Sequence, residues 1–316
     1  MIETDIHFAA ELLKKGNIVA IPTETVYGLA GNALNTDAVL KIFQVKKRPT
    51  FNPLIVHTNN LERISQLTTS FPVILQKIGE KFWPGPLTIL LPKANTIHDL
   101  VTAGNSLVAI RIPAHPDTLK LLSMIDFPLC APSANLSGYI SPTTAQHVEK
   151  QFGSEIAYIL DGGVCQVGIE STIIKLNDKD KVEILRTGKV TPEDISELTG
   201  YLPETNPISG KVEAPGMLSS HYAPKTPLLL GNLQELIARN FSIKIGVLGF
   251  QKEIKHPKIN IQRILSPTGD LNTAAKNLFS YLHELDSVDI DIIIAEPVPE
   301  QGIGIAINDR LRRAAV

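Results

Sequence analysis

Ile21-Pro-Thr-Glu-Thr-Val-Tyr-Gly-Leu-Ala-Gly31 is the stretch around which the rest of the chain is organised. The apolar run 18–21 predicts a buried strand, and Pro22 ends it because proline has no amide donor. Hydroxyl groups and a carboxylate follow at the carboxyl end of that strand, where open α/β sheets bind ligands. Gly28 and Gly31 allow either a positive φ or a close backbone approach to a ligand. The pattern also suits an ordinary strand-loop-helix turn, so this stretch alone leaves both interpretations open.

Composition limits the class of protein. The 316 residues suit two domains, and 43% hydrophobic with 20% charged residues is typical of a globular chain with a sizeable core. A net charge of -2 excludes a global basic field for nucleic acid or anionic membranes, so any phosphate site must be a local cluster.

Cellular location is predicted from the cysteines and the apolar runs. Cys130 and Cys165 have neither metal-binding nor redox spacing, which favours buried thiols in a reducing compartment. The first residues show no signal-peptide pattern, and no apolar run reaches the roughly 18 residues of a membrane span. We therefore expect a cytoplasmic protein without a membrane partner.

Residues 1–200 are predicted to form one mixed-sheet α/β domain, because strands and scattered helices do not follow strict βαβ winding. Apolar runs predict strands at 18–21, 53–58, 87–91, 107–112, 128–131, 156–160, 170–176 and 182–186. Ser141-Pro142 is expected to be the cap and first-turn proline of a helix that ends near Phe152.

The remaining residues are predicted to form a linker and a second domain. Residues 201–226 are rich in proline, and the segment Ala214–Pro224 adds apolar and aromatic side chains that a passive spacer does not need. We therefore expect this linker to pack on the protein. From 227 to 316, strands and helices alternate, which predicts a smaller Rossmann-like α/β domain with a parallel sheet. It contains neither a GxGxxG turn nor a P-loop.

Polar groups gather at the strand ends and loops of the first domain, and they are mostly cations, hydroxyls and amides. They are Thr23, Thr25, Lys46, Arg48, Asn52, His57, Arg111, Ser133, Asn135, Ser141, Ser171 and Arg186. Such a set binds phosphates or carboxylates. It lacks the paired carboxylates of a glycosidase, a GxSxG elbow and a metal-binding motif. Arg111 interrupts an apolar strand, so its charge must be paired or must face a ligand.

Several motifs in one order carry a family resemblance. They are Pro22-Thr-Glu-Thr-Val-Tyr-Gly28, Lys46-x-Arg48, Asn52-Pro-Leu-Ile-Val-His57, Trp83-Pro-Gly-Pro-Leu-Thr88, Arg111-Ile-Pro-Ala-His-Pro116, Ala131-Pro-Ser-Ala-Asn-Leu-Ser-Gly138, Ser141-Pro-Thr143 and Gly168-Ile-Glu-Ser-Thr-Ile173. Together they resemble the YrdC-domain family. The linker and the tail Gly302-Ile-Gly-Ile-Ala-Ile-Asn-Asp-Arg-Leu-Arg-Arg-Ala-Ala315 resemble the long form of that family, the L-threonylcarbamoyladenylate synthases. The match spans nearly the whole chain.

The resemblance implies a reaction. L-threonine, bicarbonate or CO2, and ATP would give threonylcarbamoyl-AMP and pyrophosphate, with Mg²⁺ on the phosphates and no metal ligand from protein side chains. The adenylate would pass to a downstream tRNA threonylcarbamoyl-transferase, and direct tRNA binding is not required. Because the carbamate itself attacks the α-phosphate, the enzyme needs no nucleophile, and catalysis is mostly positioning and charge neutralisation.

The resemblance also implies roles for individual residues around one concave site. Catalytic nucleotide contacts are implied for Lys46, Arg48, Ser133 and Asn135. Further ATP contacts are implied for Asn52, Leu107, Ser141, Arg186 and Tyr222, with His221 as the alternative linker residue. A threonine pocket is implied for Thr25, His57, Arg111, Ala131 and Ser171.

The linker is where this chain departs from the resemblance. In the long form it covers the active site, often with basic and aromatic residues just before the His-Tyr pair. This chain has Leu218-Ser-Ser220 there, so we expect its linker to act by packing rather than by phosphate contacts.

Two other functions fit less well. A nucleic-acid-binding or regulatory YrdC-type module would need more positive charge and aromatic-basic interleaving than this chain has. Carbamoyl-adenylate chemistry of the hydrogenase-maturation type resembles only the first domain, and it comes with zinc-finger and acylphosphatase segments that this chain lacks.

Overall fold

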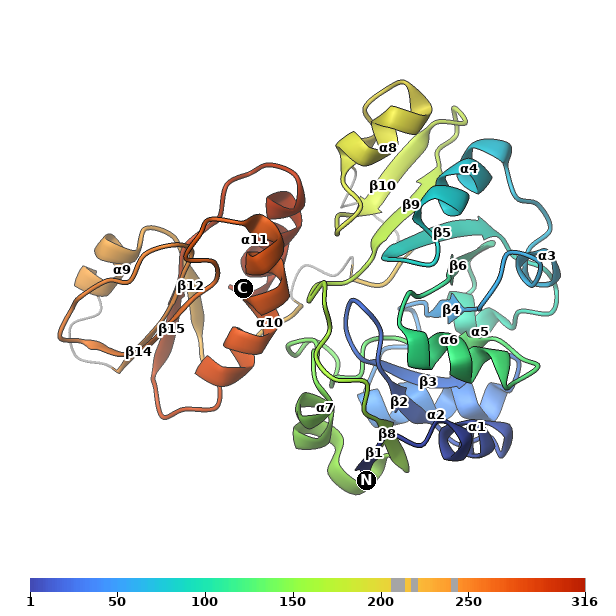
Figure 1. Ribbon diagram of the computed structural model, residues 1–316, viewed down its shortest axis with the longest axis horizontal. Coiled ribbons are helices and arrows are strands. Elements are labelled where there is room, and N and C mark those ends of the chain that lie inside the picture. The colour runs from blue at the N-terminus through green and yellow to red at the C-terminus, as the bar shows by residue number, and fades with distance from the viewer. Residues whose placement is uncertain (206–213, 217–220, 240–243, 316) are drawn as a thin grey trace.

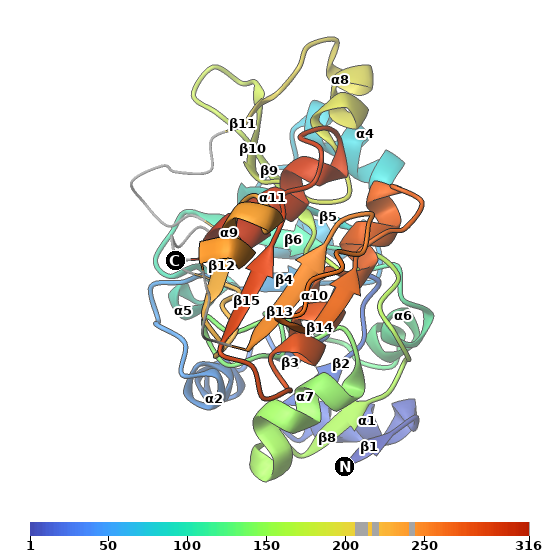
Figure 2. The ribbon, with the colours of Figure 1, turned by 90° about the vertical axis from the view of Figure 1, so that its left-hand side faces the viewer.

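Two β-sheets form the framework of the protein. A computed structural model describes residues 1–205, 214–216, 221–239 and 244–315. The larger sheet lies in the first part of the chain and the smaller in the last part, with the two ends of the linker between them (Figure 1). Seen from the side of the smaller sheet, the second domain lies across the first (Figure 2). This agrees with the expected mixed-sheet domain and smaller parallel-sheet domain.

The larger sheet is mixed, as expected. Within the described residues it has eleven strands in the order β1-β8-β2-β3-β7-β4-β6-β5-β9-β10-β11. They are β1 (Ile2–Glu3), β2 (Val19–Ile21), β3 (Gly28–Asn32), β4 (Ile55–His57), β5 (Leu87–Pro92), β6 (Leu107–Arg111), β7 (Leu129–Cys130), β8 (Tyr158–Leu160), β9 (Thr172–Leu176), β10 (Val182–Arg186) and β11 (Glu204–Thr205). The neighbours β2 and β3 run antiparallel, whereas β4 and β6 run parallel.

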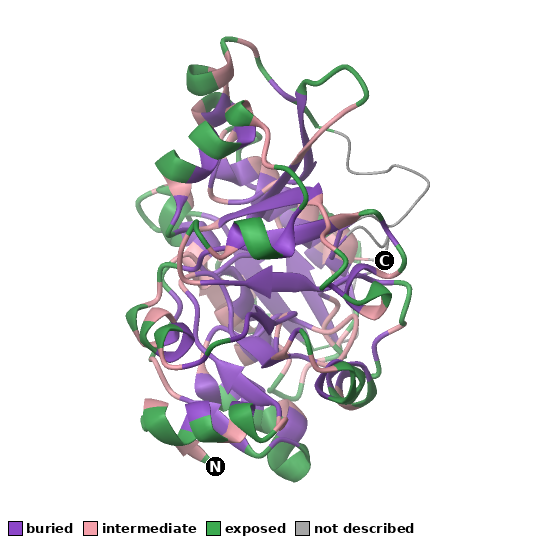
Figure 3. Ribbon diagram, turned by 90° about the vertical axis from the view of Figure 1, so that its right-hand side faces the viewer, coloured by how far each residue is buried: buried purple, intermediate pink, exposed green. Residues whose placement is uncertain are grey.

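Helices cover the two faces of this sheet unevenly. They are α1 (Ile6–Lys14), α2 (Thr36–Lys46), α3 (Ile64–Leu67), α4 (Val73–Phe82), α5 (Asp99–Thr102), α6 (Pro116–Ser123), α7 (Ala145–Phe152), the 3-10 helix η1 (Gly153–Glu155) and α8 (Pro192–Thr199). α2, α4 and α7 pack on one face, whereas α1 and α6 pack on the other face only near β2. Figure 3 shows buried strands behind helices whose outer sides are exposed.

The opening stretch forms a hairpin rather than a strand-loop-helix turn. β2 ends at Ile21, before Pro22 as expected, and the chain returns antiparallel as β3 with Gly28 opposite Ile21. Neither glycine adopts a positive φ. A Cβ on Gly28 would lie 3.1 Å from the Cβ of Ala131, and one on Gly31 would lie 3.2 Å from Ile42. Both glycines therefore permit close packing of strands and helix, and Gly28 also lines the cavity described below.

The prediction that Ser141-Pro142 starts a helix is wrong. α7 begins at Ala145, and the Thr144 hydroxyl caps it by accepting the amide of His147 at 3.2 Å. Ser141 and Pro142 are used elsewhere, because the Ser141 hydroxyl donates to Glu170 and the Pro142 carbonyl accepts the Tyr27 amide. The local cap signal was overridden by contacts with distant segments.

The smaller sheet is entirely parallel. It consists of β12 (Leu228–Leu230), β13 (Ile245–Gly249), β14 (Ile259–Ile264) and β15 (Ile292–Ala295) in the order β12-β15-β13-β14. Alternate side chains point to opposite faces. Val247 and Ile294 pack toward α9 (Leu233–Arg239), and Leu248 and Ile293 pack toward α10 (Leu271–Leu285) and α11 (Ile303–Ala314). α10 and α11 face the first domain (Figure 1).

The two domains share one apolar cluster. Val26, Ile140 and Ile169 of the first domain are buried in the same cluster as Leu278 of α10 and Leu311 of α11. The larger sheet continues to β11 at residues 204–205, which pairs with β10. The division into 1–200, 201–226 and 227–316 stays a prediction.

Two further expectations concern the whole chain. Cys130 and Cys165 are free and buried, and burial raises the pKa of the Cys130 thiol to about 12. Across the described ranges, no helix combines the length and apolar character needed to cross a bilayer.

Candidate functional site

A small cavity lies where the larger sheet, the ends of the linker and the domain interface meet. Thr25, Arg48, His57, Arg111, Ala131, Ser133, Arg186, His221 and Tyr222 line it, all of which the sequence assigned to a site. Its volume is about 40 Å³, which holds only a few waters at roughly 10–15 Å³ each. Any ligand larger than a few waters therefore requires some of the lining residues to move.

Strand register places two of these side chains on the open face of the sheet. His57 ends β4, and it pairs with Arg111 at the end of β6. Because side chains alternate along a strand, both lie on the same face as Ile55 and Ala109. These two belong to a small apolar cluster that includes Ala214 of the linker. The cavity thus has polar strand ends beside an apolar surface.

Lys46 holds the loop that follows β7. Its side chain is 1% exposed at the end of α2, and its ammonium group donates to the carbonyl of Ser133 at 2.5 Å and to that of Asn135. Burial, and then the nearby charge of Arg48, lower the pKa of Lys46 well below its usual value. The Asn135 side-chain oxygen is buried without a partner among the described residues. Lys46 does not itself line the cavity.

Arg48 is fixed by the segment that leads into β4. Its Nη2 donates to the side-chain oxygen of Asn52 at 2.6 Å and to the carbonyl of Pro53 at 2.8 Å. Burial, and then repulsion from Arg186, lower the pKa of Arg48 to about 9. The amide nitrogen of Asn52 is buried and has no partner within the described residues.

Arg186 ends β10 and reaches across to β9 and the linker. Its Nη2 donates to the Ser171 hydroxyl at 3.1 Å, and its Nη1 donates to the carbonyl of Pro215 at 3.1 Å. The Ser171 hydroxyl also shares a 2.7 Å hydrogen bond with Thr88. Burial lowers the pKa of Arg186 to about 10. Arg48 and Arg186 thus face one cavity with only neutral hydrogen-bond acceptors in the described structure.

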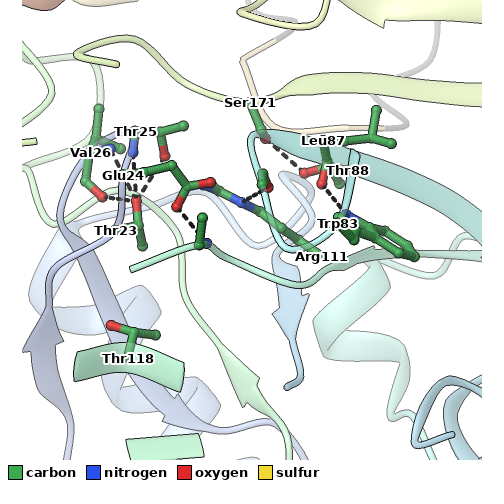
Figure 4. A network of polar contacts seen from close by, with 12 residues as sticks. Thr23, Glu24, Thr25, Val26, Trp83, Leu87, Thr88, Arg111, Thr118 and Ser171 are labelled. Carbon is green, nitrogen blue, oxygen red and sulfur yellow. Dashed lines mark hydrogen bonds and ion pairs between the residues drawn. The ribbon is translucent and has the colours of Figure 1, made fainter. Parts of the chain in front are cut away.

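Arg111 carries a different partner (Figure 4). Its Nη2 binds the Glu24 carboxylate at 2.7 Å, and the other oxygen of Glu24 accepts the Ala114 amide at 3.0 Å. The hydroxyls of Thr23 and Thr25 share a 2.8 Å hydrogen bond on the same loop. The sequence predicted that Arg111 must be paired or must face a ligand. Arg111 is paired with Glu24, and it also lines the cavity.

The two histidines of the site are neutral at physiological pH. Burial, and then Arg111, lower the pKa of His57 to about 3, and its Nδ1 lies 3.2 Å from the carbonyl of Ile55. Burial likewise lowers the pKa of His221 to about 3. His221 Nδ1 is buried without a partner among the described residues.

The described part of the linker covers the cavity. Pro215, Gly216, His221 and Tyr222 all line it. Tyr222 is 1% exposed with φ 67, a left-handed conformation that is uncommon for a residue other than glycine. Leu218, Ser219 and Ser220, at which this chain departs from the family pattern, lie outside the described residues.

Two site residues were missed by sequence reasoning. Glu170 lines the cavity at 6% exposure, and its carboxylate accepts the Ser141 hydroxyl at 2.5 Å. The other oxygen binds Arg310 Nε of α11 at 3.1 Å. Glu170 and Arg310 both lie in motifs that carry the family resemblance. A charged residue among apolar neighbours, the pattern that identified Arg111, is the signal that could have found them.

The predicted site residues that do not line the cavity are Lys46, Asn52, Leu107, Asn135, Ser141 and Ser171. Five of them hydrogen-bond a residue that does line it, and the sixth is Leu107. It starts β6, four residues and about 13 Å of strand before Arg111. It packs against the apolar cluster that includes Ile55 and Ala214. Within the described ranges, no group of three or more His, Cys, Asp or Glu side chains is arranged to hold a metal ion.

Known proteins match the chain over its full length. The family described as "Telomere recombination" matches residues 11–188, and the family "Threonylcarbamoyl-AMP synthase, C-terminal domain" matches residues 190–316. A Pyrococcus abyssi protein named threonylcarbamoyl-AMP synthase is 38% identical, over 99% of this chain and 94% of its own length. A Bacillus subtilis protein of the same name is 40% identical, over 97% of this chain and 92% of its own length. The crystal structure of P. abyssi Sua5 complexed with L-threonine superposes with a TM-score of 0.92 at 37% identity, over 100% of this chain and 96% of that one.

Proposed function

The chain belongs to the threonylcarbamoyl-AMP synthase family and is an enzyme of that class, and from this premise we propose its full reaction. L-threonine, bicarbonate or CO2, and ATP are converted to L-threonylcarbamoyl-AMP and pyrophosphate. The threonine amine first takes up the one-carbon unit to form a carbamate. A carbamate oxygen then attacks the α-phosphorus of ATP, and the bond to pyrophosphate breaks. With bicarbonate as the donor, one water is also released.

One observation carries this proposal. Two arginines without carboxylate partners among the described residues, Arg48 and Arg186, line the same cavity as the Glu24–Arg111 pair. Two kinds of anion therefore suit one site, a polyphosphate and an amino-acid carboxylate. Phosphoryl-group chemistry of this kind depends on positioning and charge neutralisation, and such a cluster supplies both.

We assign the nucleotide to the cationic side of the cavity. Lys46 and Arg48 would neutralise phosphate oxygens, and the unpartnered amide atoms of Asn52 and Asn135 supply a donor and an acceptor there. The other proposed ATP contacts are Leu107, Ser133, Ser141, Arg186 and Tyr222. Mg²⁺ enters with ATP as part of the substrate, and its charge reduces the repulsion between phosphate oxygens.

We assign L-threonine to the side of Arg111. The guanidinium fork can take the substrate carboxylate bidentately while Glu24 holds its other edge. Thr25, His57, Ala131 and Ser171 would surround the rest of the amino acid. A neutral His57 suits this position, because it can donate or accept one hydrogen bond without adding charge. The P. abyssi structure that superposes on this chain is described as complexed with L-threonine.

We also propose the place of the reaction. Two free, buried cysteines suit a reducing cytoplasm. A mixed anhydride such as threonylcarbamoyl-AMP is reactive, so it is expected to pass to a transferase that modifies tRNA.

The test is direct detection of the product. Purified protein incubated with L-threonine, bicarbonate and Mg-ATP should yield an ion with the mass of threonylcarbamoyl-AMP. Pyrophosphate release should require all three substrates. Release that ignores threonine would refute the proposal.

A further inference from the structure

Glu170 is an anion in a cavity that is proposed to bind a polyanion. Glu170 is 6% exposed and lines the same cavity as Arg48 and Arg186. A buried carboxylate without a cationic partner would repel phosphate and would pair with the nearest cation. Arg186 is such a cation, because it lines the same cavity and its charge lowers the pKa of Glu170.

The described contacts show that this competition does not occur. One oxygen of Glu170 accepts the Ser141 hydroxyl at 2.5 Å, and the other accepts Arg310 Nε at 3.1 Å. The hydrogen bonds of Arg186 go instead to the carbonyl and hydroxyl of Ser171 and to the carbonyl of Pro215. Both oxygens of Glu170 are therefore occupied by groups other than Arg186.

Arg310 is built to hold this carboxylate. It lies on α11 of the second domain with its side chain 0% exposed, and its Nη1 donates to the carbonyl of Thr187 at 2.8 Å and to Asp309 at 3.1 Å. Its guanidinium also lies 5.5 Å from the centre of the Tyr222 ring. A helix of one domain thus delivers a cation into the site of the other.

We propose that Arg310 is a positioning residue for the ATP site: by binding Glu170 from the second domain, it fixes that carboxylate on Ser141 and leaves Arg48 and Arg186 free for phosphate. This inference rests on the proposed function. Burial by itself raises the pKa of Glu170, but Arg310, Arg186 and the Ser141 hydroxyl together hold it below its usual value. Glu170 is therefore ionised at neutral pH, where its charge needs a partner.

The role predicts a particular pattern of variants of the full-length protein. In Arg310→Gln, the unpaired Glu170 turns to Arg186, and the KM for ATP should rise about tenfold or more. The KM for L-threonine should change little, because Arg310 does not contact Arg111 or Glu24 in the described structure. Adding Glu170→Gln to Arg310→Gln removes the unpaired charge and should restore most of the ATP affinity. A residue that only docks the two domains would show no such rescue.

A pH profile gives an independent readout. In Arg310→Gln, the loss of the Arg310 charge raises the pKa of Glu170, so its charge is lost at a higher pH than in the unmodified protein. The KM for ATP of that variant should therefore improve from pH 8 to pH 6, relative to the unmodified protein. In the double variant, this pH dependence should disappear.

Two further variants keep the test decisive. Arg312→Gln lies on the same helix but its ion pair is with exposed Glu300, so it should behave as the unmodified protein. Arg310→Lys keeps the charge but cannot span Glu170 and Thr187 with one nitrogen, so its KM for ATP should be intermediate. If circular dichroism shows that Arg310→Gln does not fold, Arg310→Lys serves as the test.

The outcomes separate the inference from the proposed function. If the unmodified protein makes no threonylcarbamoyl-AMP, the proposed function falls. If it is active but Arg310→Gln and Arg310→Lys bind ATP normally, only the role of Arg310 falls. The role is also overturned if Glu170→Gln fails to rescue Arg310→Gln, or if Arg312→Gln is equally impaired.

Discussion

The cavity and the domain interface both bury cations, but they balance the charge differently. In the cavity region, Lys46, Arg48 and Arg186 donate to carbonyls, an amide and a hydroxyl, and burial lowers the pKa of all three. At the interface, Arg310 binds the carboxylates of Glu170 and Asp309. Burial lowers its pKa too, but interactions with Tyr222, Glu170 and Asp309 raise it above its usual value.

The difference indicates what each region is for. A buried cation with only neutral acceptors is in an unfavourable environment until an anion arrives, so the first set is suited to binding. A buried cation with carboxylate partners already has its charge balanced, and it is suited to holding other groups in place. The four predictions below test this contrast in order of decreasing effect.

Replacing Lys46 should have the largest effect. Lys46→Met removes a charge from the cavity region and leaves the carbonyls of Ser133 and Asn135 without their donor. Because the loop that follows β7 loses its anchor and the site loses a cation, ATP affinity measured by calorimetry should fall by about 3 kcal/mol, the upper end of the range for a hydrogen bond to a charged group. Lys41→Met, an exposed lysine on the same helix, is the control. Equal affinity in both variants would remove Lys46 from the proposed ATP site.

Arg48→Ala should weaken ATP binding by about 1.5–3 kcal/mol, the range for a charged hydrogen bond. The neighbouring Lys47 is exposed and in a left-handed conformation, so Lys47→Asn is a control that keeps the backbone unstrained. Calorimetry should show a loss only for Arg48→Ala. Unchanged affinity would remove Arg48 from the site.

Arg111 is intermediate between the two regions, since it is paired with Glu24 and still lines the cavity. Arg111→Lys keeps the charge but loses the planar fork, so L-threonine affinity should fall by roughly 2 kcal/mol while ATP affinity is retained. Separate titrations with each substrate distinguish the two effects. A variant that loses ATP instead would reverse the assignment of the two halves of the cavity.

The smallest effect concerns pH and the interface. His283 stacks on His147 at 4.0 Å, and its Nε2 lies 3.1 Å from the carbonyl of Ser141. Burial lowers the pKa of His283 to about 3, below the value of about 6.5 in the unfolded chain. The unfolded state therefore binds more protons between these values, and stability falls as the pH drops below 6.5.

This single histidine should cost the protein about 1.4 kcal/mol of stability between pH 7.5 and 5.5. In urea unfolding, the free energy of unfolding of His283→Gln should fall by about 1.4 kcal/mol less between pH 7.5 and 5.5 than that of the unmodified protein. His7→Gln, an exposed histidine, serves as the control. An unchanged pH dependence would mean that His283 is not kept neutral by the interface.

Much of this molecule is predictable from local patterns. Strand runs placed Arg111, Ser171 and Arg186 near strand ends, and the parallel pairing of β4 with β6 brings His57 beside Arg111. The fold class follows from the alternation of elements. The position of β3 does not, because its glycines suggest a loop, whereas close packing against Ala131 and Ile42 requires them in a strand.

Contacts between residues that are far apart in the sequence could not be predicted from local patterns. Glu170 and Arg310 are 140 positions apart in different domains, so neither residue's neighbours in the sequence reveal the pair. Ser141 was assigned to a helix cap because Ser-Pro is a strong local signal, but its hydroxyl binds Glu170. Leu107 remains a prediction, because a backbone contact to a ligand leaves no mark in side-chain chemistry.

The apolar cluster shared by the domains has a consequence for how the protein unfolds. Val26, Ile140 and Ile169 are covered by α10 and α11, so neither half retains a complete core when the other melts. Heating should therefore give a single calorimetric transition for both halves. A chain cut in the linker would expose this apolar surface and would be prone to aggregate. The first domain therefore depends on the second for its persistence in the folded state.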